Sequence, residues 1–170
     1  MDPSDRHRPD AAGLHTRASW RDEVAGGGTR DDHGLLLVED NPGDVALFLE
    51  AVEESDVRGE VTVATSGDDA LAVIRGDDGS TPGAADDLVV LDLDLPGRSG
   101  LAVLEELKMD PETRAIPVVI LSASRDRAMV RRAYDLGANA YLVKRASFAD
   151  TVGLVDALQT FWFDVAELPE

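Results

Sequence analysis

The chain has 170 residues, of which 34 are acidic and 16 are basic, so its formal net charge is −18. A surface of this charge repels phosphate backbones and anionic lipids, which argues against a nucleic-acid-binding or membrane-surface protein. There is no cysteine, which excludes disulfides, thiolate nucleophiles and cysteine-ligated metals.

The acidic excess itself has two interpretations. It is spread over loops and helix faces, as in 76–87 and 105–112, and lysine is scarce. This pattern favours a halophilic protein over an acidic surface made for one partner, because at molar salt the screening length falls to about 3 Å. No apolar run approaches the length of a membrane span and no signal peptide is evident, so we expect a cytoplasmic protein.

The N-terminal segment differs in composition from the rest of the chain. Residues 1–33 lack a sustained apolar period and predict a disordered tail, and residues 34–170 predict one folded domain with an extended C-terminal helix. His7, His15 and His33 all lie in the tail or at its edge. The folded domain therefore has no histidine for general-base catalysis, metal binding or phosphohistidine chemistry.

From residue 35 onward, short apolar runs alternate with amphipathic stretches. In chain order the expected elements are strand 35–39, helix 43–55, strand 61–65, helix 68–76, a loop at 76–87, strand 88–93, helix 99–109, strand 116–123, helix 127–137, strand 140–144 and helix 147–163. Strict alternation of five strands and five helices implies right-handed crossovers. It predicts an α/β fold whose parallel sheet is covered by helices on both faces.

The residues at the carboxyl ends of these strands carry chemistry. Ligands of open parallel sheets bind at that edge. The candidates there are Glu39, Asp40, Asp92, Asp94, Ser122, Tyr141 and Lys144. Clustered carboxylates without histidine or cysteine suit Mg²⁺. With that ion and a lysine beside it, one carboxylate can attack a phosphoryl group to form an aspartyl phosphate, while the serine hydrogen-bonds a phosphoryl oxygen.

Each of these residues also has an ordinary interpretation when taken alone. Glu39 and Asp40 read as a solvated turn, with Asp44 near the following helix start. Ser122 alone reads as a loop hydroxyl and Lys144 as a surface charge. Their joint occurrence at the strand ends of one alternating fold favours the phosphoryl-transfer interpretation.

Four motifs, the acid pair at 39–40, LVVLDLDLPGRSG at 88–100, VVILSAS at 118–124 and YLVK at 141–144, resemble in order and spacing those of receiver domains of two-component response regulators. The resemblance covers residues 35 to about 163. It implies a flavodoxin-like sheet of order 2-1-3-4-5 with five flanking helices. It also implies a stand-alone response regulator, which accepts a phosphoryl group from a sensor histidine kinase, signals by protein contacts, and is no enzyme apart from its own phosphotransfer and dephosphorylation.

The resemblance also implies a role for each candidate residue. These are Asp92 as phosphoacceptor, Asp40 as direct metal ligand and Glu39 as a ligand through water, Asp94 as a ligand through its backbone carbonyl, Ser122 as switch hydroxyl, Lys144 as phosphate contact and Tyr141 as switch aromatic. One position departs from the family pattern, because Arg145 stands where receiver domains usually have proline. The preceding peptide bond is expected to be trans, since a cis bond before arginine costs about 3 kcal/mol.

The C-terminal segment 160–170 resembles the ending of single-domain response regulators that partner phytochromes, which implies a phytochrome-like kinase. On a helical wheel the last helix has two apolar stripes. One consists of Phe148, Val152, Val155 and Trp162, and the other of Leu154, Leu158, Phe161 and Val165. Either the sheet and a neighbouring helix cover both stripes, or they form a homodimer interface, expected to include Leu154, Leu158, Phe161, Trp162 and Val165. We favour the dimer.

Two other functions remain open from the sequence. A phosphatase of the haloacid dehalogenase type would use Asp92 as nucleophile and Asp94 as general acid, but that family places its second acid cluster after the lysine. A receiver-like module that binds partners without phosphorylation is the other alternative, and Arg145 is the reason to retain it.

Overall fold

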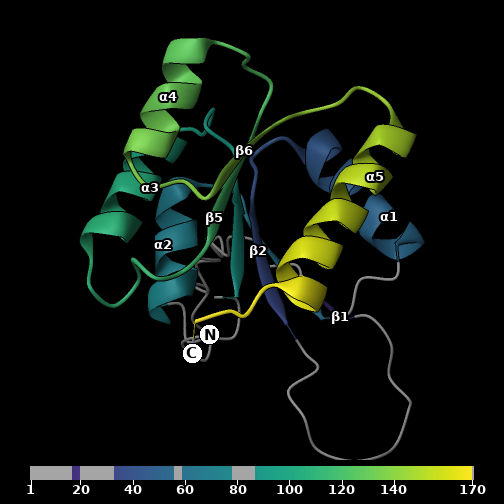
Figure 1. Cartoon of the computed structure of the whole chain (residues 1–170), viewed down its shortest axis with the longest axis horizontal. Helices are drawn as coiled ribbons and strands as arrows, with labels where there is room; N and C mark the ends of the chain where they lie inside the picture. Colours follow the sequence, from purple (N-terminus) through teal and green to yellow (C-terminus); the bar gives the residue numbers. More distant parts are fainter. Residues whose placement is uncertain (1–16, 20–32, 56–58, 78–86, 170) are drawn as a thin grey trace, which may run out of the picture.

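The computed structural model describes residues 17–19, 33–55, 59–77 and 87–169. In this part of the chain a central sheet is covered by helices on both faces (Figure 1). The rest of the predicted tail, residues 1–16 and 20–32, lies outside the described residues. So do residues 78–86 of the predicted loop.

The sheet contains five parallel strands and one antiparallel strand, in the order β1-β3-β2-β4-β5-β6. Their bounds are β1 Arg17–Ser19, β2 Gly34–Val38, β3 Glu60–Ala64, β4 Leu88–Leu91, β5 Val118–Ser122 and β6 Ala140–Val143. The parallel strands β3-β2-β4-β5-β6 have the predicted order 2-1-3-4-5, so the predicted fold class is confirmed. The additional strand, β1, pairs with β3 from within the segment expected to be a tail.

The described residues form five α-helices, of which the first four connect successive parallel strands and the fifth follows β6: α1 Pro42–Glu54, α2 Gly67–Arg75, α3 Gly100–Met109, α4 Arg127–Asp135 and α5 Phe148–Leu158. Each follows a residue whose side chain accepts a hydrogen bond from a backbone N–H of the first turn, which satisfies donors that the helix itself leaves unpaired. These capping residues are Asn41, Ser66, Ser99, Asp126 and Ser147. None of the described helices is both long enough and apolar enough to cross a membrane.

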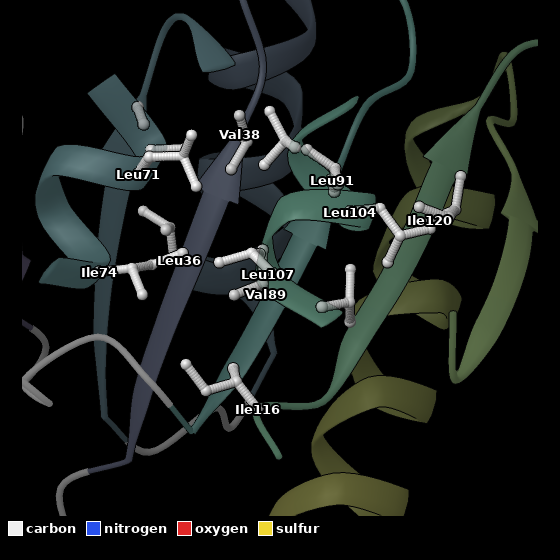
Figure 2. Close-up of a cluster of buried hydrophobic side chains, with 14 of the residues drawn as sticks. Leu36, Val38, Leu71, Ile74, Val89, Leu91, Leu104, Leu107, Ile116 and Ile120 are labelled. Carbon is white, nitrogen blue, oxygen red and sulfur yellow. The ribbon is translucent and has the colours of Figure 1, made fainter. Parts of the chain in front are cut away.

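Alternation along the strands divides the core into two layers. Leu36 and Val38 of β2 point to the face covered by α2, α3 and α4, whereas Leu35 and Leu37 point to the face covered by α1 and α5. Figure 2 shows the first layer, in which leucine and isoleucine side chains of α2 and α3 pack onto β2, β4 and β5. Because both faces are buried, the strand ends are the part of the sheet that remains open for a site.

The last predicted helix changes pitch. Its α-helical part ends at Leu158, and the chain continues as a π-helix, η1 Gln159–Val165. Because i→i+5 bonding puts more residues into each turn than an α-helix has, the stripes drawn on an α-helical wheel separate. Trp162 and Phe163 pack against the core, while Phe161 and Val165 are 56% and 69% exposed.

This change redistributes the predicted interface residues. Leu158 lies in the core of the single chain with 5% exposure, so it is not part of an exposed surface. Leu154 is half-buried on α5. Phe163 is held inward by its ring, which stacks on His33 at a centroid distance of 4.7 Å. The exposed apolar side chains of η1 are thus Phe161 and Val165.

Candidate functional site

Two buried carboxylates lie side by side at one edge of the sheet. Strands β2 and β4 are neighbours, with Val38 opposite Leu91, so the residues that follow them, Glu39 and Asp92, leave the sheet together. The backbone N–H of Asp92 donates to the carbonyl of Val38 at 3.0 Å, which fixes this register past the end of β4. Glu39 is 3% exposed and Asp92 4% exposed. Two carboxylates this poorly hydrated need a cation nearby.

Lys144 supplies a positive charge from the end of β6. Its amine donates hydrogen bonds to Glu39 Oε2 at 2.6 Å, to Asp44 Oδ2 at 2.8 Å and to Asp92 Oδ2 at 3.0 Å. The backbone N–H of Lys144 donates to the carbonyl of Ser122 at 2.9 Å, so the lysine is anchored to the neighbouring strand β5. The residues that directly follow β2, β4 and β6, together with Asp44 from the first turn of α1, therefore meet in one cluster.

Burial and pairing act in opposite directions on these groups. Burial raises the pKa of Glu39, and the hydrogen bond from Lys144 only partly offsets that effect. Partial burial alone would lower the pKa of Lys144, but the hydrogen bonds to Asp44, Glu39 and Asp92 outweigh it, so the pKa of Lys144 is raised. The amine is therefore a permanent cation at neutral pH.

Three carboxylates of this edge are placed to hold a metal ion. One oxygen from each of Glu39, Asp40 and Asp92 lies within 4.8 Å of the other two. Two ligands of one magnesium ion are at most about 4.2 Å apart, since each Mg–O bond is about 2.1 Å, so small side-chain movements suffice. Asp40 is exposed, which leaves one side of the cluster open to an ion with its water ligands. The residues present thus fit a hard divalent cation.

Ser122 and Tyr141 lie on strands β5 and β6 beside this cluster. The hydroxyl of Ser122 is fully buried and accepts a hydrogen bond from the backbone N–H of Ser124 at 3.2 Å. The hydroxyl of Tyr141 donates to the carbonyl of Ser124 at 3.0 Å. Both side chains therefore contact Ser124, in the loop between β5 and α4.

Asp94 and Arg145 occupy the rim of the site. The backbone N–H of Asp94 donates to Asp92 Oδ1 at 3.3 Å, while the side chain of Asp94 is exposed and is not part of the carboxylate cluster. Arg145 is exposed beside Lys144. No peptide bond among the described residues is cis, so the bond before Arg145 is trans as expected.

One member of the site could not be identified as a site residue from the sequence. Asp44 was expected only near a helix start, whereas its carboxylate is one of the three partners of Lys144. The sequence did indicate the position of Asp44. It lies four residues after Asp40, on the first turn of a helix that begins at the same edge of the sheet because it follows β2 directly. The spacing places Asp44 at this edge, but it does not specify a contact with a lysine a hundred residues later.

Known proteins are similar to this chain over most of the fold, including every residue of the carboxylate–lysine cluster. The family model of the response regulator receiver domain matches residues 35–156. Response regulator Rcp1 of Synechocystis sp. is 33% identical over 135 residues, which are 79% of this chain and 92% of Rcp1.

The similar solved structures are also response regulators. The Mn(2+)-bound form of response regulator Rcp1 has a TM-score of 0.73 at 32% identity, over 81% of this chain and 99% of that chain. The phosphorylated cyanobacterial phytochrome response regulator RcpA also has a TM-score of 0.73, at 37% identity, over 82% of this chain and 99% of that chain.

Proposed function

This chain belongs to the response regulator receiver domain family, whose members are phosphorylated on an aspartate, and on that premise we propose that Asp92 is the phosphoacceptor in this chain. The observation that supports this assignment is the contact between Asp92 and Lys144, within a cluster that also fits a divalent cation. Glu39 and Asp92 are both buried carboxylates of the group placed to hold a cation. Asp92 is the one that follows β4, the middle of the five parallel strands, and the amine of Lys144 lies 3.0 Å away.

In the proposed reaction an oxygen of Asp92 forms a bond to the phosphorus of the donor. The donor's own bond to phosphorus breaks, and its electron pair leaves with the donor group. Lys144 holds a positive charge against the oxygens of the transferred group, and the buried hydroxyl of Ser122 donates to one of them once the loop that it contacts has shifted. Tyr141, bonded to that same loop, is expected to move with it.

We propose Mg²⁺ as the ion held by Asp40, Asp92 and, through water, Glu39, with the backbone carbonyl of Asp94 as a further ligand. When bound, the ion neutralises charge that develops on the phosphoryl oxygens. What supports this choice is a donor set made only of carboxylate oxygens, which suits a hard cation.

Receiver domains of this kind are regulators that histidine kinases phosphorylate, rather than enzymes in the ordinary sense. We infer that the partner kinase of this chain is phytochrome-like. The C-terminal Phe-Trp sequence and the similarity to RcpA, a cyanobacterial phytochrome response regulator, support this inference. We further propose a cytoplasmic location, a homodimer formed through the exposed residues of the last helix, and adaptation of the acidic surface to high salt.

The phosphatase alternative is not favoured. It needs the side chain of Asp94 as an acid beside Asp92, whereas the side chain of Asp94 is exposed and only its backbone N–H contacts Asp92. The family match is to receiver domains, which gives the haloacid dehalogenase interpretation no support.

The test is incubation with acetyl phosphate followed by intact-mass measurement. We expect the wild-type chain to gain one phosphoryl group in the presence of Mg²⁺ and none in the presence of a chelator. The Asp92→Asn variant should gain none. Asp94→Asn is the matched control, because it removes a carboxylate two residues away, and it should still be phosphorylated. A wild-type chain that gains no phosphoryl group at low or molar salt would favour a module that acts without phosphorylation.

A further inference from the structure

The amine of Lys144 has no hydrogen-bond donor to spare. An ammonium group has three N–H bonds, and Lys144 contacts three carboxylates at distances of 2.6, 2.8 and 3.0 Å. If the amine is to contact a phosphoryl oxygen, at least one of these hydrogen bonds must be given up. The question is which carboxylate releases the lysine most easily.

The three carboxylates differ in burial. The side chains of Glu39 and Asp92 are 3% and 5% exposed, so bulk water has little access to these carboxylates and compensates poorly for loss of the lysine. The side chain of Asp44 is 44% exposed. Water can solvate the carboxylate of Asp44 as soon as the amine leaves, which makes this hydrogen bond the least costly of the three to break.

The position of Asp44 is nevertheless fixed. It lies in the first turn of α1, where the side chain of Asn41 accepts hydrogen bonds from the backbone N–H groups of Gly43 at 2.8 Å and of Asp44 at 3.2 Å. A carboxylate in a first helical turn is also favoured by the helix dipole. Asp44 is therefore held near the lysine by its backbone, whether or not the two side chains are paired.

We propose that Asp44 is a positioning residue, which holds Lys144 in the unphosphorylated site and competes with the phosphoryl group for its amine. This inference rests on the proposed role of Asp92 as phosphoacceptor. Asp44 lies outside the group of carboxylates placed to hold a metal ion. A cation bound by Glu39 and Asp92 would weaken their attraction for Lys144, and Asp44 would then be the remaining competitor.

The test is the affinity for beryllofluoride, a phosphoryl mimic, measured calorimetrically at saturating Mg²⁺. Because an ion pair that is partly exposed on the Asp44 side is a weak interaction, Asp44→Asn is expected to bind beryllofluoride about two- to fivefold more tightly than the wild type. Asp44→Glu, which restores a carboxylate, should return toward the wild-type value. The gain should shrink at molar salt, where the competing pair is screened in the wild type as well.

A double-mutant cycle separates positioning from other effects. If Asp44 acts through Lys144, then adding Asp44→Asn to a Lys144→Gln background should leave the affinity unchanged. Glu50→Gln is the matched control for loss of one negative charge, since Glu50 is exposed further along the same helix, and it should not change the affinity. Urea unfolding of each variant checks that the fold is retained.

Two results would overturn the inference. One is an affinity of Asp44→Asn that equals or falls below that of the wild type. The other is an equal increase in beryllofluoride affinity when Asp44→Asn is introduced into the wild type and into Lys144→Gln, which would show a general effect of charge. If the wild type binds beryllofluoride but either of these results is found, only this inference fails. If the wild type binds no beryllofluoride and accepts no phosphoryl group, the proposed function of Asp92 fails as well.

Discussion

At the scale of single residues, the site depends on a lysine that is shared by several acids. The carboxylates of Glu39 and Asp92 are buried where they are poorly hydrated, and Lys144 compensates both. Removing one partner of such a buried group costs more than the pair contributes, because the remaining charge is left without compensation. The lysine is therefore expected to stabilise the fold, in addition to the role in phosphoryl transfer proposed above.

We predict that Lys144→Gln lowers the free energy of unfolding at pH 7 by about 3 kcal/mol in metal-free buffer. The pKa of Lys144 is raised above its ordinary value of 10.5. Its stabilising effect is therefore complete below that pH and is lost as the pH rises through the folded-state value. The difference between the wild type and the variant, measured by urea unfolding, should thus be constant near neutrality and shrink above about pH 10.5.

Lys108 is the control for this prediction. Its amine is also partly buried, but it donates to the backbone carbonyls of Arg114 and Ile116, and burial lowers its pKa. The deficit of Lys108→Gln should therefore not shrink over the same alkaline range. A Lys144→Gln deficit that stays constant above pH 10.5, or that is absent at pH 7, would contradict the role of Lys144 in compensating the buried carboxylates.

The sequence predicted most of this site, and the exception is instructive. Glu39, Asp92 and Lys144 come directly after strands, so the sheet topology alone brings them to one edge. Asp44 comes from a helix, and whether its side chain turns toward Lys144 depends on rotamers and on the angle at which α1 begins. Neither quantity can be derived from residue spacing.

At the scale of secondary-structure elements, a close approach between the start of α3 and the segment that follows β4 holds Asp92 in place. The backbone N–H of Gly100 donates to the carbonyl of Leu93 at 3.0 Å. A Cβ atom on Gly100 would lie 2.1 Å from the carbonyl oxygen of Asp92 and 2.7 Å from the Cα of Leu93. These are backbone atoms and cannot move aside, so only glycine permits this contact.

We predict that Gly100→Ala lowers the free energy of unfolding by at least about 2 kcal/mol through overpacking, and that it slows phosphorylation because it displaces the backbone of Asp92. Gly153→Ala is the contrasting variant, since a Cβ there meets nothing within 4 Å on the exposed face of α5. It should gain about 0.5–1 kcal/mol from helix propensity. Equal urea midpoints for the two variants would contradict the close approach at Gly100.

Two elements could not be predicted from the sequence, whereas the five parallel strands could, because each is an apolar run between helical patterns. The apolar residues of 159–165 fit an α-helical wheel equally well, so the pattern does not distinguish the π-helix, in which Trp162 and Phe163 pack against the core. The strand β1 was missed because Arg17–Ser19 has neither alternation nor a run of apolar residues. Both elements therefore depend on tertiary contacts rather than on local pattern.

At the scale of the whole molecule, the exposed apolar side chains of η1 bear on whether two copies of the chain associate. We predict that Phe161→Asp converts the proposed dimer to a monomer in sedimentation velocity, because Phe161 is 56% exposed and is not itself part of the buried core. Met109→Asp is the control, since Met109 is 76% exposed at the end of α3, a helix of the opposite face, and should not affect assembly. A wild-type chain that is monomeric at every concentration would contradict the proposed dimer.

The net charge of −18 also acts on the whole molecule. Self-repulsion among exposed carboxylates destabilises the compact state, and the screening length falls from about 10 Å at 0.1 M salt to about 3 Å at 1 M. We therefore predict that the thermal unfolding midpoint rises steadily over this range, equally in potassium chloride and sodium chloride. A midpoint that is unchanged or that falls would contradict adaptation to high salt.

The most direct test of the central claim is to locate the phosphoryl group in the chain. After phosphorylation with acetyl phosphate, borohydride reduction converts an aspartyl phosphate to homoserine, and tandem mass spectrometry of the tryptic peptide 76–98 identifies the modified residue. We predict homoserine at position 92 and an unmodified aspartate at position 94. Modification at Asp94, or outside this peptide at Glu39 or Asp40, would contradict the assignment of Asp92 as the phosphoacceptor.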